Sequence, residues 1–299
     1  MAGPEIKKVA FFGLGIMGWR MAANIGRAGF DLSVWTHSEG KAERFASEHG
    51  ATAANTPAEA AEGADAAITM VVDSPEVEAV LFGEHGAANA PGGLPHGALC
   101  IDMSTIAPSA ARAIGTKVEG RGFHFLEAPV SGSKPKAEDG TLTIMAAGSD
   151  EAFGRAQPVL EAMGEKIVHV GPQGHGQMAK VLTNTMGAAN AAALGEAVTM
   201  ARAAGLDQDA FLDVASGSSG NSTILAMKGR PMFEHDFEPP LFKLEHLLKD
   251  VRHCLHEAEA LGIALELGRL VERLYMGASM DGHGEEDVAA IVTEAEKRA

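Results

Sequence analysis

Short apolar runs alternate with helical stretches over residues 7–171. In a parallel sheet that is covered on both faces the strands are apolar throughout, and helices connect them. The pattern therefore predicts an α/β domain built on a doubly wound parallel sheet. The predicted strands are 9–12, 32–35, 66–72, 99–103, 123–126, 141–147 and 167–170, and the predicted helices include 17–28, 42–48, 58–62, 109–118 and 151–163. Pro57, Pro75 and Pro108 each stand where a helix would begin, a position that needs no backbone N–H.

The strand pattern ends after Gly176, and the rest of the chain has helical periodicity. Residues 177–204 are rich in Ala, Met and Leu and carry little charge, so we expect a long helix that is apolar nearly all round and buried between neighbours. Further helices are predicted at 209–214, 241–261, 266–276 and 285–297. We therefore expect two domains, the α/β domain at 1–173 and an all-α domain at 174–299, joined by the long helix.

Composition narrows the class of protein. The chain has 299 residues, enough for two domains, and 40 acidic against 24 basic side chains give it a formal charge of −16. Such a charge argues against a nucleic-acid partner, which needs a basic surface. Cys100 and Cys254 form no CxxC pair, no apolar run is long enough to span a membrane, and residues 1–8 lack the apolar core of a signal peptide. These features predict a cytoplasmic protein with reduced thiols and no membrane association.

A glycine-rich loop directly follows the first predicted strand and opens a helix. In such a GxGxxG motif the first glycine allows a tight turn, the second lets the backbone approach a pyrophosphate, and the third lets the helix pack close to the strand. The helix N-terminus then points at the anion. Gly29 is placed to end this helix in a left-handed cap. The predicted dinucleotide-binding residues of this Rossmann-type loop are Gly13, Leu14, Gly15, Ile16, Met17 and Gly18.

The end of the second predicted strand bears on the choice between NADH and NADPH. An acidic residue there would bind the ribose 2′-hydroxyl of NAD and repel a 2′-phosphate. The strand instead ends in Thr36-His37-Ser38, with Lys41 one turn later. We assign Thr36, His37 and Ser38 to cofactor binding and expect NADPH to be favoured over NADH.

Two further segments suggest chemistry. Ser131, Gly132 and Ser133 follow a predicted strand and offer small donors that could hold a carboxylate, although a structural turn would look the same. Lys180 lies near the start of the long helix with Asn184 one turn later on the same face. A lysine in an apolar helix is costly to bury, which makes Lys180 a candidate proton donor to a carbonyl oxygen. The alternative is a lysine that snorkels at the helix edge.

Together these segments resemble the β-hydroxyacid dehydrogenase family over nearly the whole chain. The resemblance rests on residues 13–18 with 21–24, 101–105, 127–132 with 140–144, 174–184 and 242–250. It implies an N-terminal Rossmann domain, a helical C-terminal domain and assembly as a homodimer or homotetramer. The implied roles are a catalytic lysine for Lys180, substrate orientation for Asn184, carboxylate binding for Ser131 and Gly132, a place beside the nicotinamide ribose for Thr105, and closure over cofactor and substrate for Lys249 and Asp250. We also assign Phe242 to the substrate and Val72 to the cofactor.

Within the family, residues 129–140 and 239–250 are most similar to the glyoxylate and succinic semialdehyde reductases. We therefore predict an NADPH-dependent reductase of a small aldehyde acid. Two positions depart from the relatives: Ser133 replaces a second glycine that many of them carry, and His37 replaces an arginine common in NADPH users. The alternatives are an NAD-dependent dehydrogenase of 3-hydroxyisobutyrate or a related 3-hydroxy acid, and a tartronate semialdehyde (2-hydroxy-3-oxopropionate) reductase. An imine reductase usually lacks the lysine found at Lys180.

His246, Asp250 and His253 have a spacing that can bind a metal on one helix face. Hydride transfer of this kind needs no metal, and the resemblance already gives Asp250 a role. We therefore predict no metal site and a small carboxylate as the ligand besides the dinucleotide.

Overall fold

The computed structural model describes residues 5–297, so the outer ends of the two predicted domains, 1–4 and 298–299, lie outside the described residues. The chain forms two compact units that divide between Lys180 and Val181. This division lies inside a long helix, seven residues beyond the predicted boundary at 173/174. In the part of the chain that the structure describes, no helix is long and apolar enough to cross a membrane.

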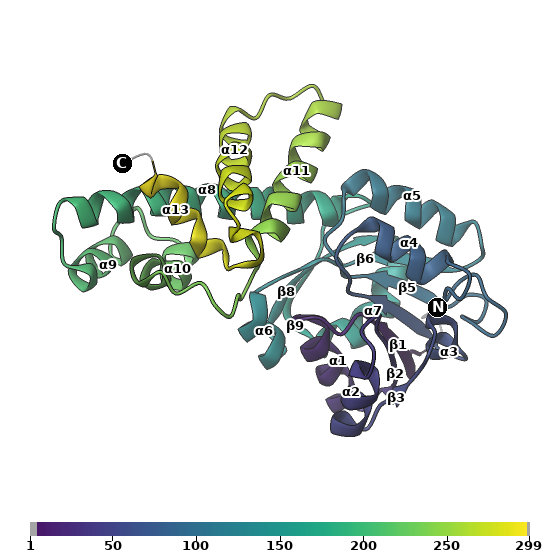
Figure 1. Cartoon of the computed structure of the whole chain (residues 1–299). Coiled ribbons are helices and arrows are strands. Elements are labelled where there is room, and N and C mark those ends of the chain that lie inside the picture. Colours follow the sequence, from purple (N-terminus) through teal and green to yellow (C-terminus); the bar gives the residue numbers. More distant parts are fainter. Residues whose placement is uncertain (1–4, 298–299) are drawn as a thin grey trace. The chain divides into compact units, whose positions relative to one another are not determined.

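The first unit contains a mainly parallel sheet (Figure 1). The order across it is β3-β2-β1-β4-β5-β6-β8-β7, with β9 paired to β8. From β1 the strand order runs one way through β2 and β3 and the other way through β4, β5 and β6, so it reverses at β1. This confirms the predicted doubly wound sheet. The strands are β1 (Lys8–Phe12), β2 (Asp31–Trp35), β3 (Thr52–Ala53), β4 (Ala66–Thr69), β5 (Leu99–Asp102), β6 (His124–Glu127), β7 (Val130–Ser131), β8 (Leu142–Gly148) and β9 (Gly164–His169).

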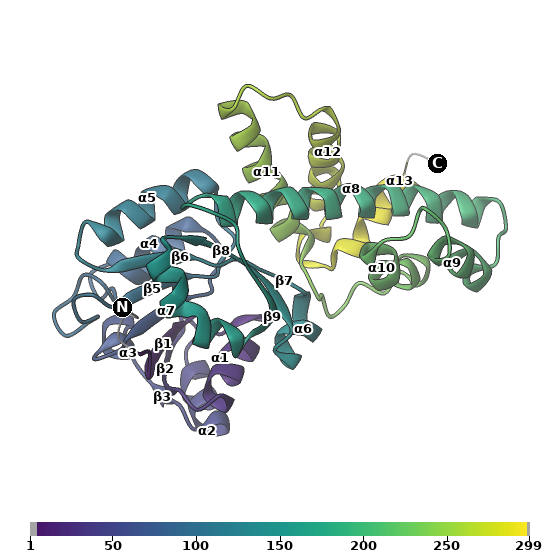
Figure 2. The ribbon, with the colours of Figure 1, turned by 180° about the vertical axis from the view of Figure 1, so that it is seen from behind.

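Helices cover both faces of this sheet, as Figure 2 shows from behind. They are α1 (Gly18–Arg27), α2 (Lys41–His49), α3 (Pro57–Ala61), α4 (Ser74–Phe82), α5 (Pro108–Glu119), α6 (Ser133–Asp139) and α7 (Asp150–Glu161). Alternate residues of β1 enter different cores: Val9 and Phe11 pack with α1, α2 and α7, whereas Phe12 packs with α3, α4 and α5. This alternation explains why β1 is apolar at every one of these positions.

Local signals for the helix ends are largely confirmed. Pro57 and Pro108 are the first residues of their helices, and Pro75 is the second residue of α4. Gly29 follows α1 with a φ of +93°, in the left-handed region that the cap requires. Both cysteines are buried and free.

The sheet differs from the prediction near its second edge. Strand β8 runs antiparallel to β6 and β7, whereas the sequence pattern predicted only parallel strands. The two-residue strands β3 and β7 and the short helix α6 were not predicted, because such short segments carry too little periodicity. For α4 the sequence predicted the start, at Pro75, but not the extent. Strand β4 ends at Thr69 rather than at Val72, which places Val72 in the following loop.

The second unit is helical, with most of α8 (His175–Ala203) as its longest element. The other elements are α9 (Gln208–Ser216), α10 (Thr223–Glu234), α11 (Leu244–Ala260), α12 (Glu266–Met280), η1 (His283–Glu285), η2 (Val288–Ile291) and α13 (Val292–Glu296). Helix α10 was not predicted, and the single helix expected at 285–297 is divided into η1, η2 and α13.

The predicted burial of α8 on all sides is wrong for the isolated chain. Ala188, Ala191 and Val198 are fully buried in the core of the second unit. On other faces of the helix, Met186 and Met200 are 67% and 72% exposed. An apolar sequence establishes that burial is favourable, but it does not specify which faces find a partner within one chain.

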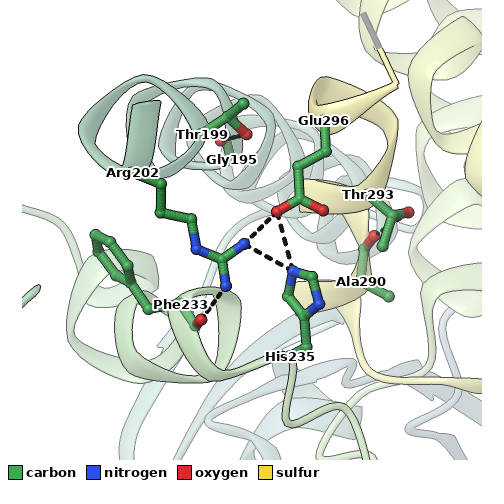
Figure 3. A network of polar contacts seen from close by, with 8 residues as sticks. All are labelled: Gly195, Thr199, Arg202, Phe233, His235, Ala290, Thr293 and Glu296. Carbon is green, nitrogen blue, oxygen red and sulfur yellow. Dashed lines mark hydrogen bonds and ion pairs between the residues drawn. The ribbon is translucent and has the colours of Figure 1, made fainter. Parts of the chain in front are cut away.

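Polar contacts hold the C-terminal helix α13 in the second unit (Figure 3). Arg202, near the end of α8, donates to Glu296 of α13 and to the carbonyl of Phe233 in α10. His235 Nε2 lies 2.9 Å from both the Arg202 Nη1 and the Glu296 Oε1. These contacts join three segments that are far apart in the sequence.

Candidate active site

The glycine loop between β1 and α1 has the three distinct environments that a dinucleotide-binding turn requires. Gly13 has a φ of +99°, and a Cβ there would collide with the carbonyl oxygen of Met70. A Cβ on Gly18 would collide with the carbonyl oxygen of Gly13, so this glycine permits close packing of helix on strand. A Cβ on Gly15 would meet nothing within 4 Å. The backbone at Gly15 is therefore the point that an incoming pyrophosphate can approach.

The N-terminus of α1 is also suited to an anion. Its N-cap residue, Met17, makes no side-chain cap hydrogen bond, and the first turn contains no acidic residue. Several other helix starts are capped by a side-chain oxygen, from Thr56 for α3, Ser149 for α7, Asp207 for α9 and Ser222 for α10, whereas α2, α5, α6, α11 and α12 resemble α1 in having no such cap. First-turn N–H groups and the helix dipole favour bound phosphate. The residues present thus fit the phosphates of a dinucleotide.

The tip of β2 is attached to this loop. Gly13 N–H donates to the carbonyl of Trp35 at 2.9 Å, and Leu14 N–H donates to the Thr36 hydroxyl at 3.4 Å. Thr36 is half-buried, whereas His37 and Ser38 are exposed and accessible to a ligand. Thr36 therefore shapes the loop, while the next two residues remain available to a ribose or its phosphate.

The loops after β4 and β5 contribute the other predicted cofactor residues of this unit. Val72 is 52% exposed, and Thr105 is half-buried. The carboxyl ends of β1, β2, β4 and β5 lie at one edge of the sheet because these strands are parallel neighbours. Ligands of doubly wound sheets bind at this edge, where the strand order reverses.

The predicted carboxylate cradle forms the turn between β7 and α6. Gly132 has a φ of +142°, and Ser133 has a φ of +55°. Ser133 thus occupies the left-handed region that glycine favours, at a cost of order 1 kcal/mol or more. Ser131, Gly132 and Ser133 are all half-buried, so the turn is partly accessible.

A buried glutamate, Glu127, ties the start of α8 to the end of β6. Its carboxylate accepts hydrogen bonds from the N–H groups of Gly174, of Gly176 at 3.3 Å and of Gln177 at 3.2 Å. Burial raises the pKa of Glu127 to about 7, with a smaller contribution from the charge of Asp102, although the three N–H donors oppose this rise. Glu127 therefore caps the helix that carries Lys180, which is only 8% exposed.

The second unit holds the remaining predicted substrate residues. Asn184 donates its amide to Asp250 at 2.6 Å, and the Lys249 ammonium lies 3.1 Å from the other oxygen of Asp250. Asp250 is 1% exposed, so its carboxylate orients Asn184 and Lys249 within the protein. Phe242 is half-buried, and its N–H donates to Asp287 at 3.3 Å. Asp287 forms a buried ion pair with Lys228 at 2.7 Å, which fixes the segment before α11.

Sequence reasoning gave no role to Glu127, Asp102 or Gln177, all of which are buried here. For Glu127 and Asp102 the available signal was an acidic side chain at the end of an apolar strand, whereas Gln177 lies in helix α8 and carried no such signal. For His246, burial lowers the pKa, assisted by the charge of Lys249. Within residues 5–297, no three His, Cys, Asp or Glu side chains are grouped in a way that could hold a metal ion.

Comparison with known proteins identifies the family. Residues 8–171 match the NAD-binding domain of 6-phosphogluconate dehydrogenase, and residues 174–295 match the NAD-binding family of NADP-dependent 3-hydroxyisobutyrate dehydrogenase. The 2-hydroxy-3-oxopropionate reductase of Escherichia coli (strain K12) is 35% identical over 285 residues, which are 95% of this chain and 96% of the relative. The chain belongs to the β-hydroxyacid dehydrogenase family.

Two further similarities agree with this assignment. The chloroplastic glyoxylate/succinic semialdehyde reductase 2 of Arabidopsis thaliana is 32% identical, over 95% of this chain and 78% of the relative. The crystal structure of a 3-hydroxyisobutyrate dehydrogenase from Salmonella typhimurium superimposes with a TM-score of 0.87 at 29% identity, covering 96% of this chain and 99% of the other. The protein is thus an NAD(P)-dependent oxidoreductase that acts on CH–OH groups, as the sequence predicted.

The space at Gly15 generates a prediction about cofactor binding. In Gly15→Ala the added methyl group should fit the fold but obstruct the approach of the pyrophosphate, raising the Kd for NADPH about 10-fold, or about 1.4 kcal/mol. A fluorescence titration with NADPH measures this change. Gly154→Ala, in α7, is the matched control because its Cβ also meets nothing within 4 Å. Equal Kd values for the two variants would contradict the assignment of Gly15.

The raised pKa of Glu127 predicts a pH-dependent stability. Between about pH 4.5 and 7 the folded state holds the Glu127 proton more tightly than the unfolded state does. The free energy of unfolding should therefore fall as pH rises through this window, by up to about 3 kcal/mol from this group. Urea unfolding of the wild type and of Glu127→Gln at several pH values isolates the effect. The slope should flatten in Glu127→Gln but not in the control Glu165→Gln, an exposed position; unchanged slopes would refute the claim.

Proposed function

We propose that this enzyme is an NADPH-dependent reductase of a small aldehyde acid such as glyoxylate or succinic semialdehyde, with Lys180 as the general acid. The observation that carries the proposal is the position of Lys180. It is nine-tenths buried in the second turn of a helix whose start is capped by Glu127 at the carboxyl edge of the sheet. Lysine side chains are mostly exposed in proteins, so a lysine buried at this edge of the sheet is a candidate for chemistry.

Each predicted residue then has a defined task. The N–H and hydroxyl groups of Ser131, Gly132 and Ser133 hold the substrate carboxylate. Asn184, one turn beyond Lys180 on α8, orients the substrate carbonyl, and Asp250 fixes the direction of the Asn184 amide. When bound, the reduced nicotinamide supplies hydride to the carbonyl carbon. The Lys180 Nζ gives a proton to the carbonyl oxygen, which completes the alcohol.

The cofactor is held by residues whose environments fit its parts. Residues 13–18 bind the pyrophosphate through the backbone at Gly15 and the start of α1. His37 and Ser38 would bind the 2′-phosphate, Thr105 would lie beside the nicotinamide ribose, and Val72 would also take part in cofactor binding. Lys249 would also bind the cofactor. The preference for NADPH is supported by the absence of a carboxylate at residues 36–38.

A second candidate is NAD-dependent oxidation of 3-hydroxyisobutyrate or a related 3-hydroxy acid. It is favoured by Glu39, an exposed carboxylate one residue beyond Ser38 that would repel a 2′-phosphate. The similarity to the Salmonella 3-hydroxyisobutyrate dehydrogenase also supports it. A third candidate, reduction of 2-hydroxy-3-oxopropionate (tartronate semialdehyde), is supported by the name of the E. coli relative.

A substrate panel separates these candidates. Purified enzyme is supplied with NADPH or NADH and with glyoxylate, succinic semialdehyde, tartronate semialdehyde or methylmalonate semialdehyde. We expect the highest kcat/KM with NADPH and one of the first two substrates. Failure to reduce any of them, with NAD-linked oxidation of 3-hydroxyisobutyrate instead, would overturn both the substrate and the cofactor assignments.

The role of Lys180 predicts a selective loss of chemistry. Lys180→Ala should lower kcat by about 10²–10⁴-fold, the usual contribution of a positioned acid, while the Kd for NADPH stays within about 3-fold of the wild type. Steady-state rates and a cofactor titration measure the two effects. Lys166→Ala, an exposed lysine on β9, should leave both values unchanged. Weakened cofactor binding with an unchanged kcat would disprove the assignment.

A further inference from the structure

Gln177 is a fully buried side chain in the first turn of α8, and both ends of its amide are used. Its Nε2 donates to the carbonyl oxygen of Ser104 at 2.8 Å, and its Oε1 accepts from the N–H of Ile106 at 3.2 Å. The two contacts flank Thr105 on either side. Gln177 thus fixes the loop after β5, although more than seventy residues of chain separate the two.

This loop is itself rigidly attached to the sheet. Ser104 N–H donates to the buried carboxylate of Asp102 at 3.1 Å, and the same carboxylate accepts from the Thr69 hydroxyl at 2.7 Å. The Ser104 hydroxyl accepts from Val71 N–H at 3.0 Å. The loop that Gln177 contacts is therefore hydrogen-bonded to the ends of both β4 and β5.

The backbone of the same helical turn is fixed by Glu127, which accepts a hydrogen bond from the Gln177 N–H. One residue is thus held twice, through its backbone by β6 and through its side chain by the loop after β5. Lys180 follows three residues later, so it lies on the same helix face as Gln177. A displacement of the Gln177 side chain would move the first turns of α8 and carry Lys180 with them.

We propose that Gln177 is a positioning residue that sets the place of Lys180 relative to the loop at Thr105, and hence relative to the nicotinamide. This proposal rests on the proposed function, in which Lys180 is the acid and Thr105 lies beside the nicotinamide ribose. Proton donation requires close alignment of donor and carbonyl oxygen, and a misplacement of about 1 Å can cost on the order of 100-fold in rate. Gln177 acts through Lys180 and does not touch the substrate itself.

A double-mutant cycle tests the proposal. Gln177→Met keeps the shape of the side chain and removes both hydrogen bonds, and it is made in the wild type and in Lys180→Ala. We expect kcat to fall about 10–100-fold in the wild-type background, with KM and the Kd for NADPH within about 3-fold. In the Lys180→Ala background the same change should lower kcat by less than about 2-fold, because the group that it positions is gone.

The matched control is Gln157→Met on α7, an exposed glutamine whose amide contacts Glu161. It should leave kcat unchanged in both backgrounds. If Gln177→Met does not fold, Gln177→Glu replaces it in the cycle, because it keeps the acceptor for Ile106 and loses only the donor to Ser104.

The outcomes are distinct. Equal losses of kcat in both backgrounds would show that Gln177 supports the structure generally, and would overturn the proposal. A raised Kd for NADPH with an unchanged kcat would assign Gln177 to the cofactor loop alone and would also overturn it. If Lys180→Ala by itself retains wild-type kcat, the proposed function fails first, and this result is separate from the behaviour of Gln177.

Discussion

The capping of α8 by Glu127 is the interaction on which the rest of the candidate site depends. The first N–H groups of a helix have no partner within the helix, and here a carboxylate at the end of β6 satisfies three of them. Burying a carboxylate is costly, which is reflected in its raised pKa, and the cost is offset by these donors. Because Glu127 lies at the end of β6, these hydrogen bonds fix the start of the helix at the carboxyl edge of the sheet. Lys180 is therefore positioned by strand geometry as well as by its own helix.

The parallel sheet positions the loops that carry the predicted cofactor-binding residues. Because β1, β2, β4, β5 and β6 are parallel neighbours, all of them end at one edge. The loops that leave this edge carry the glycine turn, the β2 tip at His37 and the segment around Thr105. The glycines illustrate how strictly such an edge is built, since Gly13 and Gly18 are required by packing and Gly15 leaves open space.

In the second unit, buried charges serve orientation. Asp250 orients the side chains of Asn184 and Lys249. The Lys228–Asp287 ion pair fixes the backbone before α11, because Asp287 also accepts a hydrogen bond from the Phe242 N–H. Replacing such a pair with apolar residues often costs little stability, so the ion pair itself is weak evidence of stabilisation. The helical unit thus presents a small number of polar side chains from an otherwise apolar core.

The sequence by itself determined the features that are encoded locally. The alternation of apolar runs and helices predicted the doubly wound sheet, and the glycine spacing predicted separate roles that the packing at Gly13 and Gly18 supports. Only the tertiary structure decided the reversed direction of β8, the exposed faces of α8 and the partners of Glu127 and Gln177. The physical reason is the separation along the chain between the groups that interact. Periodicity and turn residues act through neighbouring backbone, whereas a hydrogen bond across fifty or seventy residues exists only after the sheet and the helix have packed together.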